Sequence, residues 1–577
     1  MVTTRPRVTQ VVFALVVWFS TFVLGSRALQ LNATRYLNTI SEGQKSLFTE
    51  AIDALEANFA PPLLFDSPRY SAWFAVGLLA RNEDDDIKLA TALIQNALEF
   101  QFKDPSRLWF GTFKNDPNAP DPGPLFPPNI YNSYDPNNAL FVCTSWIIIM
   151  EEFQHLLDPS LVMLMKESMY NATVGDGYRV GGVDGDNLFP IYSNPWYGSL
   201  LKVIAKANDG DHWNMRAKNM SMWGDTWAQE AITEFERFNT LSEFNSGTYA
   251  GVTLYALSLY GYMPKNSVIA KAAPGIITRI WATVAEFYNP SLCTLGGPWD
   301  RSYGFDMREY FAILGGQMAG LIRDSRESSS GSPCEPIPTP LLGSQHFADV
   351  AAVLLTTLLS KFHDPLIPPL TLSRLTQTTE TPHLIKVQAV SPPFDNLLYP
   401  RNYTSWNEEG LSVGGVEFDM AFVGGASVNP EQFTPAVLLW KTGVPGRDVG
   451  WISHHVTWRS VSARASPDNL TISYLPLRAF PDNSSSVESN ILTLLVSGIP
   501  GYTLPLHFGD HDKEVQLPGL KLRFSGSERT MSAERLLRYG DGMVNGLSYY
   551  NLTYIIPPMG TRREVDVLEL VLGFEKG

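Results

Sequence analysis

The chain has 577 residues, of which 44% are hydrophobic and 18% charged, so it is too long for one ordinary core and too apolar to be disordered throughout. Its formal net charge is −15 and it has no basic stripe, which argues against a nucleic-acid binder. Aromatic residues make up 12%, a content typical of enzymes and lectins that stack on flat ligands, and also of large cores.

Residues 1–28 have the three parts of a secretory signal peptide. Arg5 and Arg7 precede an apolar run over residues 11–24, and Ser26 and Ala28 are the small residues expected before a cleavage site. As a helix this run spans only about 21 Å, less than a bilayer core of about 30 Å. The sequence therefore predicts a secreted, extracellular protein that passes through the ER. The alternative is an uncleaved signal, which would leave a single-pass membrane anchor.

Asparagine and cysteine usage agrees with export. Seven sequons are candidate N-glycosylation sites: Asn32, Asn171, Asn219, Asn402, Asn469, Asn483 and Asn551. Cys143, Cys293 and Cys334 allow at most one disulfide, so this is not a disulfide-stapled domain. We expect no metal site and no cofactor.

Apolar residues recur at helical spacing through the first part of the chain. The expected helices are 43–59, 69–81, 84–101, 136–153, 158–171, 193–207, 212–239, 246–261, 265–288, 303–323 and 345–362. From about residue 380 the pattern changes to alternation and β-branched runs, which predict an antiparallel β-sandwich. The expected strands are 383–390, 414–423, 451–463, 469–477, 491–499, 520–524, 551–556 and 565–574.

Two segments rich in Pro and polar residues interrupt these patterns. One is a loop over 324–340, and the other is a joint over 363–370 that marks the expected domain boundary. The sequence thus predicts three parts, a signal peptide (1–28), a helical domain (29–365) and a β-sandwich domain (366–577).

Alternate helices are preceded by similar junctions. Each junction has a capping Asp, Asn or Ser and an aromatic residue, at 66–70, 134–137, 192–197, 243–249 and 299–303. The recurrence indicates a helical hairpin repeated about every 55 residues, which would close into an (α/α) toroid. The second helix of each pair would form the inner ring. All inner N-termini would then meet at one mouth, where their dipoles favour an anionic or hydroxyl-rich ligand.

This arrangement resembles secreted carbohydrate-active enzymes that combine an α/α toroid with a β-sandwich. They are polysaccharide lyases of the chondroitin-lyase and heparinase type and uronic-acid-processing glycoside hydrolases. Such lyases use an Asn or Gln, a His and a Tyr, so the resemblance implies roles for Asn245, Tyr249 and Tyr303. His155 and His212 are the only histidines before residue 346, and neither is expected at an inner-helix mouth. A more distant likeness is to linalool dehydratase/isomerase-like toroids, whose cysteine arrangement is not evident here.

The densest polar segment is residues 296–310. Asp300 and Tyr303 are candidate acid–base residues, and Arg301 and Arg308 could bind a substrate carboxylate beside Trp299. The alternative is a helix start with Asp caps and ion pairs.

Three further junctions carry candidates. Glu243, Asn245 and Tyr249 stand at the start of an inner helix, where the alternative is tight packing through small residues. Tyr134 and Asp135 could bind substrate or serve as cap and core. Trp196 and Tyr197 could stack on a sugar or lie in the core. Because successive inner helices are neighbours, we expect the segments around Asn245 and Asp300 to face one cleft.

The sequence favours an enzyme acting on an acidic or uronic-acid-containing glycan, with hydrolase and lyase not separated. The alternatives are a toroid enzyme acting on a non-sugar secondary metabolite, of the isomerase, dehydratase or cyclase kind, and a non-catalytic secreted glycoprotein. The sequence has no G-x-S-x-G elbow, P-loop or H-E-x-x-H motif, which disfavours serine-hydrolase, NTPase and zincin chemistry. The expected partners are a glycan or small-molecule substrate, with no nucleic acid, and a membrane only if the N-terminal segment stays uncleaved.

Overall fold

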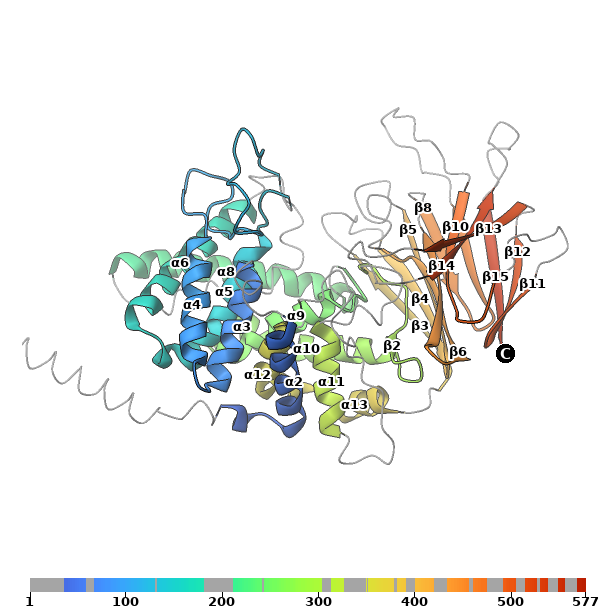
Figure 1. Cartoon of the computed structure of the whole chain (residues 1–577), viewed down its shortest axis with the longest axis horizontal. Helices are drawn as coiled ribbons and strands as arrows, with labels where there is room; N and C mark the ends of the chain where they lie inside the picture. The colour runs from blue at the N-terminus through green and yellow to red at the C-terminus, as the bar shows by residue number, and fades with distance from the viewer. Residues whose placement is uncertain are drawn as a thin grey trace, which may run out of the picture.

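The computed structural model has a helical region followed by a large antiparallel sheet (Figure 1). It describes residues 36–58, 67–129, 132–180, 211–240, 243–302, 313–325, 349, 351–377, 381–390, 400–419, 433–455, 460–474, 491–504, 514–526, 530–537, 548–555 and 568–577. The expected signal peptide and the expected helix 193–207 lie outside these residues.

The helices closely follow the expected ranges. They are α2 (Glu42–Asn58), α3 (Pro68–Arg81), α4 (Asp86–Glu99), α5 (Asn137–Ile148), α6 (Pro159–Val180), α8 (Asp211–Phe238), α9 (Tyr249–Ser258), α10 (Val268–Phe287), α11 (Ile313–Ser325), α12 (Ala351–His363) and α13 (Pro369–Thr376). Local signals set their ends. In α3, Pro68 occupies the first turn and Asn82 ends the helix in the left-handed conformation, while Ser267 accepts a hydrogen bond from the Ala270 N–H at the start of α10.

Burial separates inner from outer helices. α5 is buried along its whole length, and α3, α9, α11 and α12 are buried over nearly all of theirs. α4 and α10 bury only one face, as outer helices do. Four of the buried helices are the ones that follow the junctions at 66–70, 134–137, 243–249 and 299–303, so the expected alternation of inner and outer helices is confirmed for them.

The two ends of the helical region meet. α2 packs against α11 and α12, and α12 also contacts α3, so early and late helices of the region lie together as a ring of paired helices requires. Among the described helices, only α10 is long and apolar enough to cross a membrane by length and composition. It packs against α8, α9 and α13 within the helical region.

The helical region continues past residue 365. α13 begins at Pro369, near the end of the Pro-rich joint, and packs on α10 and α11. The sequence analysis missed this helix because its Pro residues read as a linker, yet Pro is well tolerated in a first helical turn. The strands begin only at His383.

A short hairpin, β1 (Tyr288–Asn289) and β2 (Thr294–Leu295), leads out of α10. The sheet strands are β3 (His383–Ala389), β4 (Arg401–Glu408), β5 (Leu411–Asp419), β6 (Ala436–Val444), β7 (Arg447–His455), β8 (Ser460–Ala465), β9 (Asn469–Tyr474), β10 (Ile491–Ser497), β11 (Glu514–Leu517), β12 (Leu520–Gly526), β13 (Thr530–Leu537), β14 (Ser548–Ile555) and β15 (Leu568–Lys576). Over the described residues the order is β11–β12–β15–β9–β8–β5–β6–β7–β10–β14–β13, and β4 joins β3 to β5.

The sheet folds over on itself. β9 and β7 are four strands apart in the order, which in a flat sheet would place them about 19 Å apart. Nevertheless the His454 ring nitrogen Nε2 lies 3.0 Å from the Tyr474 hydroxyl oxygen, and β6 packs against β12. Two layers therefore enclose a common core, as expected for a β-sandwich.

Four strands were not expected: β4, β6, β11 and β13. β4 escaped prediction because several of its inward-facing side chains are polar, so the strand lacks the alternation of apolar and polar residues that marks a strand. The side chains of Ser405 and Asn407 are both buried, and Asn407 donates to the carbonyls of Glu286 and Phe287 at the end of α10. This strand faces the helical region, and no pattern within the strand itself indicates that.

Candidate functional site

The candidate site lies where two distant segments of the helical region meet. Residues 243–248 lead into α9, and residues 296–302 follow β2. The Asn245 side-chain amide donates to the carbonyls of Gly296 (2.8 Å) and Pro298 (2.7 Å), and the Asp300 N–H donates to the Phe244 carbonyl (3.1 Å). The two segments that we expected to face one cleft are therefore in direct contact.

The turn before α9 has an unusual backbone. Glu243 and Asn245 both have positive φ, at 55° and 57°, a conformation that non-glycine residues rarely adopt. Asn tolerates it better than most residues, and the two hydrogen bonds from the Asn245 amide hold the turn in place. This conformation sets the direction of the side chains on either side of the turn.

Glu243, Arg301 and Tyr249 form the exposed side of this contact. The Glu243 carboxylate accepts from the Arg301 guanidinium at 2.9 Å, and the Arg301 guanidinium carbon lies 5.2 Å from the centre of the Tyr249 ring. The Glu243 and Arg301 side chains are 15% and 31% exposed. The pKa of Glu243 is raised to about 7. Burial is the largest cause, the positive charge of Arg301 opposes it, and the negative charge of Asp300 adds to it.

A second basic group, Arg69, lies within electrostatic reach of Tyr249. The electrostatic neighbours of the Arg69 guanidinium, at the start of α3, are Asp349, Tyr70, Asp135 and Tyr249. Arg69 is ion-paired to the Asp349 carboxylate at 2.8 Å. The start of α3, the start of α9 and the segment before α11 therefore converge at one mouth, as the junction pattern predicted.

Arg69 is held in place by aromatic rings. Its guanidinium carbon lies 3.8 Å from the ring centre of Phe141, 4.6 Å from that of Trp73 and 5.3 Å from that of Tyr70. The stacked rings and the ion pair with Asp349 hold the Arg69 guanidinium in one orientation. A lysine could not replace it, because its ammonium group is not planar and does not stack on aromatic rings. Sequence analysis noted the junction at 66–70 but assigned Arg69 no role. The signal was available, because Arg69 and Arg301 both stand within a recurring junction.

Asp300 lies on the opposite, closed side of the contact. Its carboxylate is ion-paired to Arg401 at the start of β4, and the two side chains are only 4% and 6% exposed. Beside them, Trp299 and Thr434 exchange backbone hydrogen bonds of 3.0 Å, and the Ser302 hydroxyl lies 3.0 Å from that of Thr434. This face of the 296–302 segment therefore joins the helical region to the sheet.

Several predicted residues lie elsewhere or in the core. Trp299 and Tyr134 are 0% and 2% exposed, so neither presents a ring to a ligand, and Tyr134 packs with Phe102 and Trp109. The Asp135 carboxylate accepts from the Asn137 N–H at the start of α5, which is the capping role left open above. Trp196, Tyr197, Tyr303 and Arg308 lie outside the described residues.

The sequons are spread over both regions. Asn171 and Asn219 lie on α6 and α8, and Asn402, Asn469 and Asn551 lie on strands. Asn402 is exposed on β4, whereas the side-chain oxygen of Asn551 is buried in β14. Asn32 and Asn483 lie outside the described residues, and glycosylation stays a prediction.

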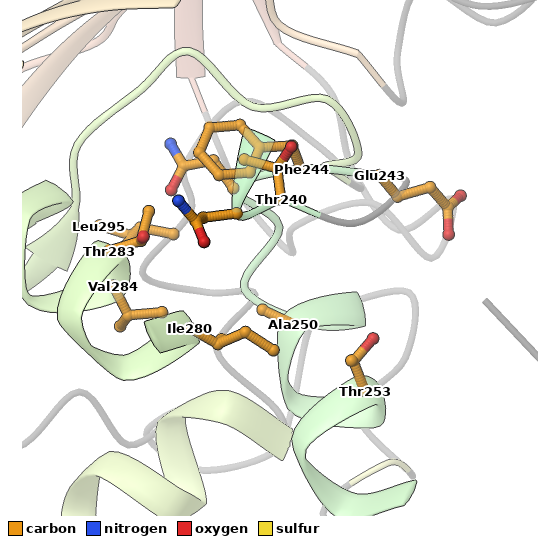
Figure 2. Close-up of a pocket in the computed structure, with 11 residues that line it drawn as sticks. Thr240, Glu243, Phe244, Ala250, Thr253, Ile280, Thr283, Val284 and Leu295 are labelled. Carbon is orange, nitrogen blue, oxygen red and sulfur yellow. The ribbon is translucent and has the colours of Figure 1, made fainter. Parts of the chain in front are cut away.

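A small pocket of about 50 Å³ lies behind the turn, between the first turns of α9 and the end of α10. In Figure 2 the Glu243 carboxylate points away from the other labelled side chains that line it. Thr253, Ile280 and Val284 are among these lining residues. The pocket has room for only a few water molecules, and Glu243, which lines it, also takes part in the charged mouth. Among the described residues, no three His, Cys, Asp or Glu side chains cluster so that they could hold a metal ion.

Residues 43–361 match the model of a domain of unknown function, DUF8769. The chain belongs to this family. Residues 381–571 match a second domain of unknown function, DUF8770, and no curated protein matches the chain.

Among solved structures, the chain is similar to heparinase III, with 9% identity over 93% of this chain and 85% of that one, and a TM-score of 0.38. It is also similar to the heparan sulfate lyase HepC from Pedobacter heparinus, with 9% identity over 88% and 76% and a TM-score of 0.25. At these scores neither structure informs the assignment of residues in this chain.

Arg401 and Thr434 were missed by the sequence analysis. They lie about 100 residues or more beyond Asp300, in a strand and a loop of the sheet region. Only the packing of the two regions brings them to the site, so no local motif could have identified them.

Proposed function

We propose that this chain is an exported enzyme that cleaves a uronic-acid-containing glycan by β-elimination at the mouth of the inner helices. One observation carries the proposal: Tyr249, a proton-transferring side chain, has the Arg301 guanidinium 5.2 Å from its ring centre and also interacts electrostatically with Arg69. Elimination beside a carboxylate needs a cation to stabilise the negative charge that develops, and a group that moves a proton.

The roles follow from exposure. Arg301 is the accessible cation, and it binds the uronate carboxylate in the geometry that a guanidinium favours. Tyr249 removes the proton next to that carboxylate. The electron pair of the broken C–H bond forms a double bond as the glycosidic oxygen departs with its bonding pair and takes that proton from the Tyr249 hydroxyl, so Tyr249 is a phenolate before and after the step. Arg69 adds positive potential, and Asn245 positions the turn.

Hydrolysis is the less favoured reaction. A glycosidase needs two accessible carboxyl groups on opposite sides of the bond that is cleaved. Glu243 is partly accessible, but Asp300 is enclosed in its ion pair with Arg401. Elimination requires no second carboxylate, so the arrangement of the described residues fits it better.

Export is supported by chemistry as well as by the N-terminal segment. Cys293 is in a disulfide, whereas Cys143 is free and buried. Structural disulfides persist mainly in oxidising compartments such as the ER lumen and the extracellular space. With the sequons, this favours a secreted protein.

The test is incubation of the full-length protein with uronic-acid-containing glycans. Elimination leaves an unsaturated uronate that absorbs in the ultraviolet, whereas hydrolysis gives reducing ends without that absorbance. Tyr249→Phe should lower kcat by about 10²-fold or more. Tyr260→Phe is the matched control, because that hydroxyl donates to the Phe362 carbonyl at the far end of the same helical segment. Cleavage by hydrolysis, no cleavage of any acidic glycan, or full activity of Tyr249→Phe would overturn the proposal.

A further inference from the structure

The sheet region has a much larger hollow than the pocket behind Glu243. Its volume is about 890 Å³, within the range of ligand-binding clefts. Turns between successive strands and the end of the last strand surround it, close to the point marked C in Figure 1. They are Glu409–Gly410 after β4, Lys441–Gly443 in the β6–β7 hairpin, Gln516–Gly519 between β11 and β12, and Lys576–Gly577.

The hollow lies far from the candidate site. Arg401 stands at the start of β4 and Glu408 at its end, a separation of about 23 Å along an extended strand. Glu409 follows directly and lines the hollow. A ligand bound here would therefore not reach Tyr249 or Arg301 by the same contacts.

The walls are rigid and close-packed. The Tyr502 hydroxyl donates to the Gln516 carbonyl at 2.7 Å, and the Trp440 indole donates to the Pro518 carbonyl at 2.8 Å. Gly519 has φ of 74°, and a Cβ there would lie 2.2 Å from the Lys441 carbonyl oxygen, so only glycine allows these turns to approach. The shape of the hollow is thus set before any ligand binds, which lowers the entropic cost of binding.

The lining combines an apolar floor with a mixed polar rim. The half-buried Pro518 and Tyr502 supply apolar surface, and the exposed Lys441, Gln516 and Glu409 supply donors and acceptors. Lys576 is held by the Glu408 carboxylate at 3.2 Å and by the Glu409 carbonyl at 3.0 Å. Because Glu408 pairs with Lys576, the other charged side chains that line the hollow are Lys441 and Glu409, one of each sign.

We propose that this hollow is a second, non-catalytic binding site for a neutral, hydroxyl-rich saccharide. Sugar hydroxyls both donate and accept hydrogen bonds, and a rim of ammonium, amide and carboxylate groups provides both partners. The apolar ring faces of a sugar match the floor of Tyr502 and Pro518. An anionic ligand fits less well, because Glu409 and Glu408 offset the two lysines. The proposal is independent of the reaction at the mouth.

The experiment is isothermal titration of the full-length protein with neutral oligosaccharides (cello-, manno-, xylo- and chito-oligosaccharides) and with acidic oligosaccharides, each at low and high salt. Lys441→Met and Glu409→Gln should each weaken binding of a neutral saccharide by about tenfold, the loss typical of a hydrogen bond to a charged group. Lys386→Met, on an exposed lysine of β3 outside the hollow, is the control and should bind normally.

The affinity for a neutral saccharide should also be almost insensitive to salt. Unchanged unfolding midpoints will show that the variants are folded, since both residues are exposed. No binding of any neutral saccharide, binding that neither variant weakens, or binding of acidic saccharides alone with a steep salt dependence would each overturn the proposal. Failure to cleave acidic glycans would instead count only against the reaction proposed for the mouth.

Discussion

Two neighbouring residues, Asp300 and Arg301, have opposite surroundings. Asp300 turns into the joint between the helical and sheet regions, where it and Arg401 are almost completely buried. Arg301 turns to the mouth of the inner helices, where about a third of its side chain is exposed and it pairs with Glu243. One short segment therefore fixes the two regions together with one charge and presents the next charge to a ligand. Burial distinguishes the two roles, although both residues are charged and ion-paired.

Breaking the buried pair of Asp300 and Arg401 should destabilise the fold. Arg401→Met leaves the Asp300 carboxylate buried without its cation and should lower the free energy of unfolding by about 3–5 kcal/mol. Urea unfolding monitored by circular dichroism measures this. The control is Arg464→Met on β8, because Arg464 is 69% exposed in its pair with Glu417 and should cost at most about 1 kcal/mol.

A double variant sharpens the same test. Replacing both partners, by Asp300→Leu with Arg401→Met, removes the unpaired charge and should recover most of the lost stability. If the single variant is as stable as the control, the joint is not held by this pair and the comparison fails.

Breaking the partly exposed pair of Glu243 and Arg301 should change function more than stability. Arg301→Met should lower the free energy of unfolding by about 1 kcal/mol or less, because the pair is partly solvated. It should lower kcat/KM on a uronic-acid-containing glycan about 10- to 100-fold, through loss of a charged hydrogen bond to the substrate. Arg279→Met, in the exposed pair with Glu236, is the matched control and should leave cleavage unchanged. Unaltered cleavage by Arg301→Met would remove Arg301 from the site.

The order of helices and strands could be predicted because it depends on local patterns. Apolar periodicity located most helix ends to within a few residues, and the recurring junctions predicted that the segments around Asn245 and Asp300 face one cleft. The contacts that the sheet region makes with the helical region could not be predicted. Arg401 gives no local sign that it is buried, and the polar residues of β4 disguise a strand whose inner side chains bond to the end of α10.

Burial also decides whether an aromatic residue can contact a ligand, which the residue type alone does not show. Trp299 was expected at the substrate, but its indole donates to the Leu295 carbonyl and is completely enclosed. A tryptophan at a helix junction has the same sequence context whether it faces solvent or core. The number of neighbours around it is a property of the tertiary structure, so only the fold separates these cases.

A pH dependence should also separate Glu243 from ordinary surface acids. Its pKa of about 7 in the folded protein, raised mainly by burial, exceeds its usual value of 4.5. Between these two values the folded protein keeps the proton and the unfolded chain releases it. The stability that Glu243 contributes is therefore complete below about pH 4.5 and is lost as the pH rises through 7, at up to about 1.4 kcal/mol per pH unit.

Glu243→Gln keeps the shape and cannot ionise, so the difference in unfolding free energy between wild type and variant should fall across this range. Urea unfolding at a series of pH values from 4.5 to 7.5 measures it. Glu236→Gln is the control, because the hydrogen bond from Arg279 lowers the pKa of Glu236; its contribution changes only at lower pH, so its difference from wild type should stay nearly constant across this range. Parallel curves for wild type and Glu243→Gln would mean that the Glu243 carboxylate is solvated like a surface acid. The carboxylates at the mouth and on the outer surface would then differ only in position. If instead the difference in unfolding free energy falls as the pH rises, Glu243 gains and loses its proton near neutral pH, where it can take part in proton transfer.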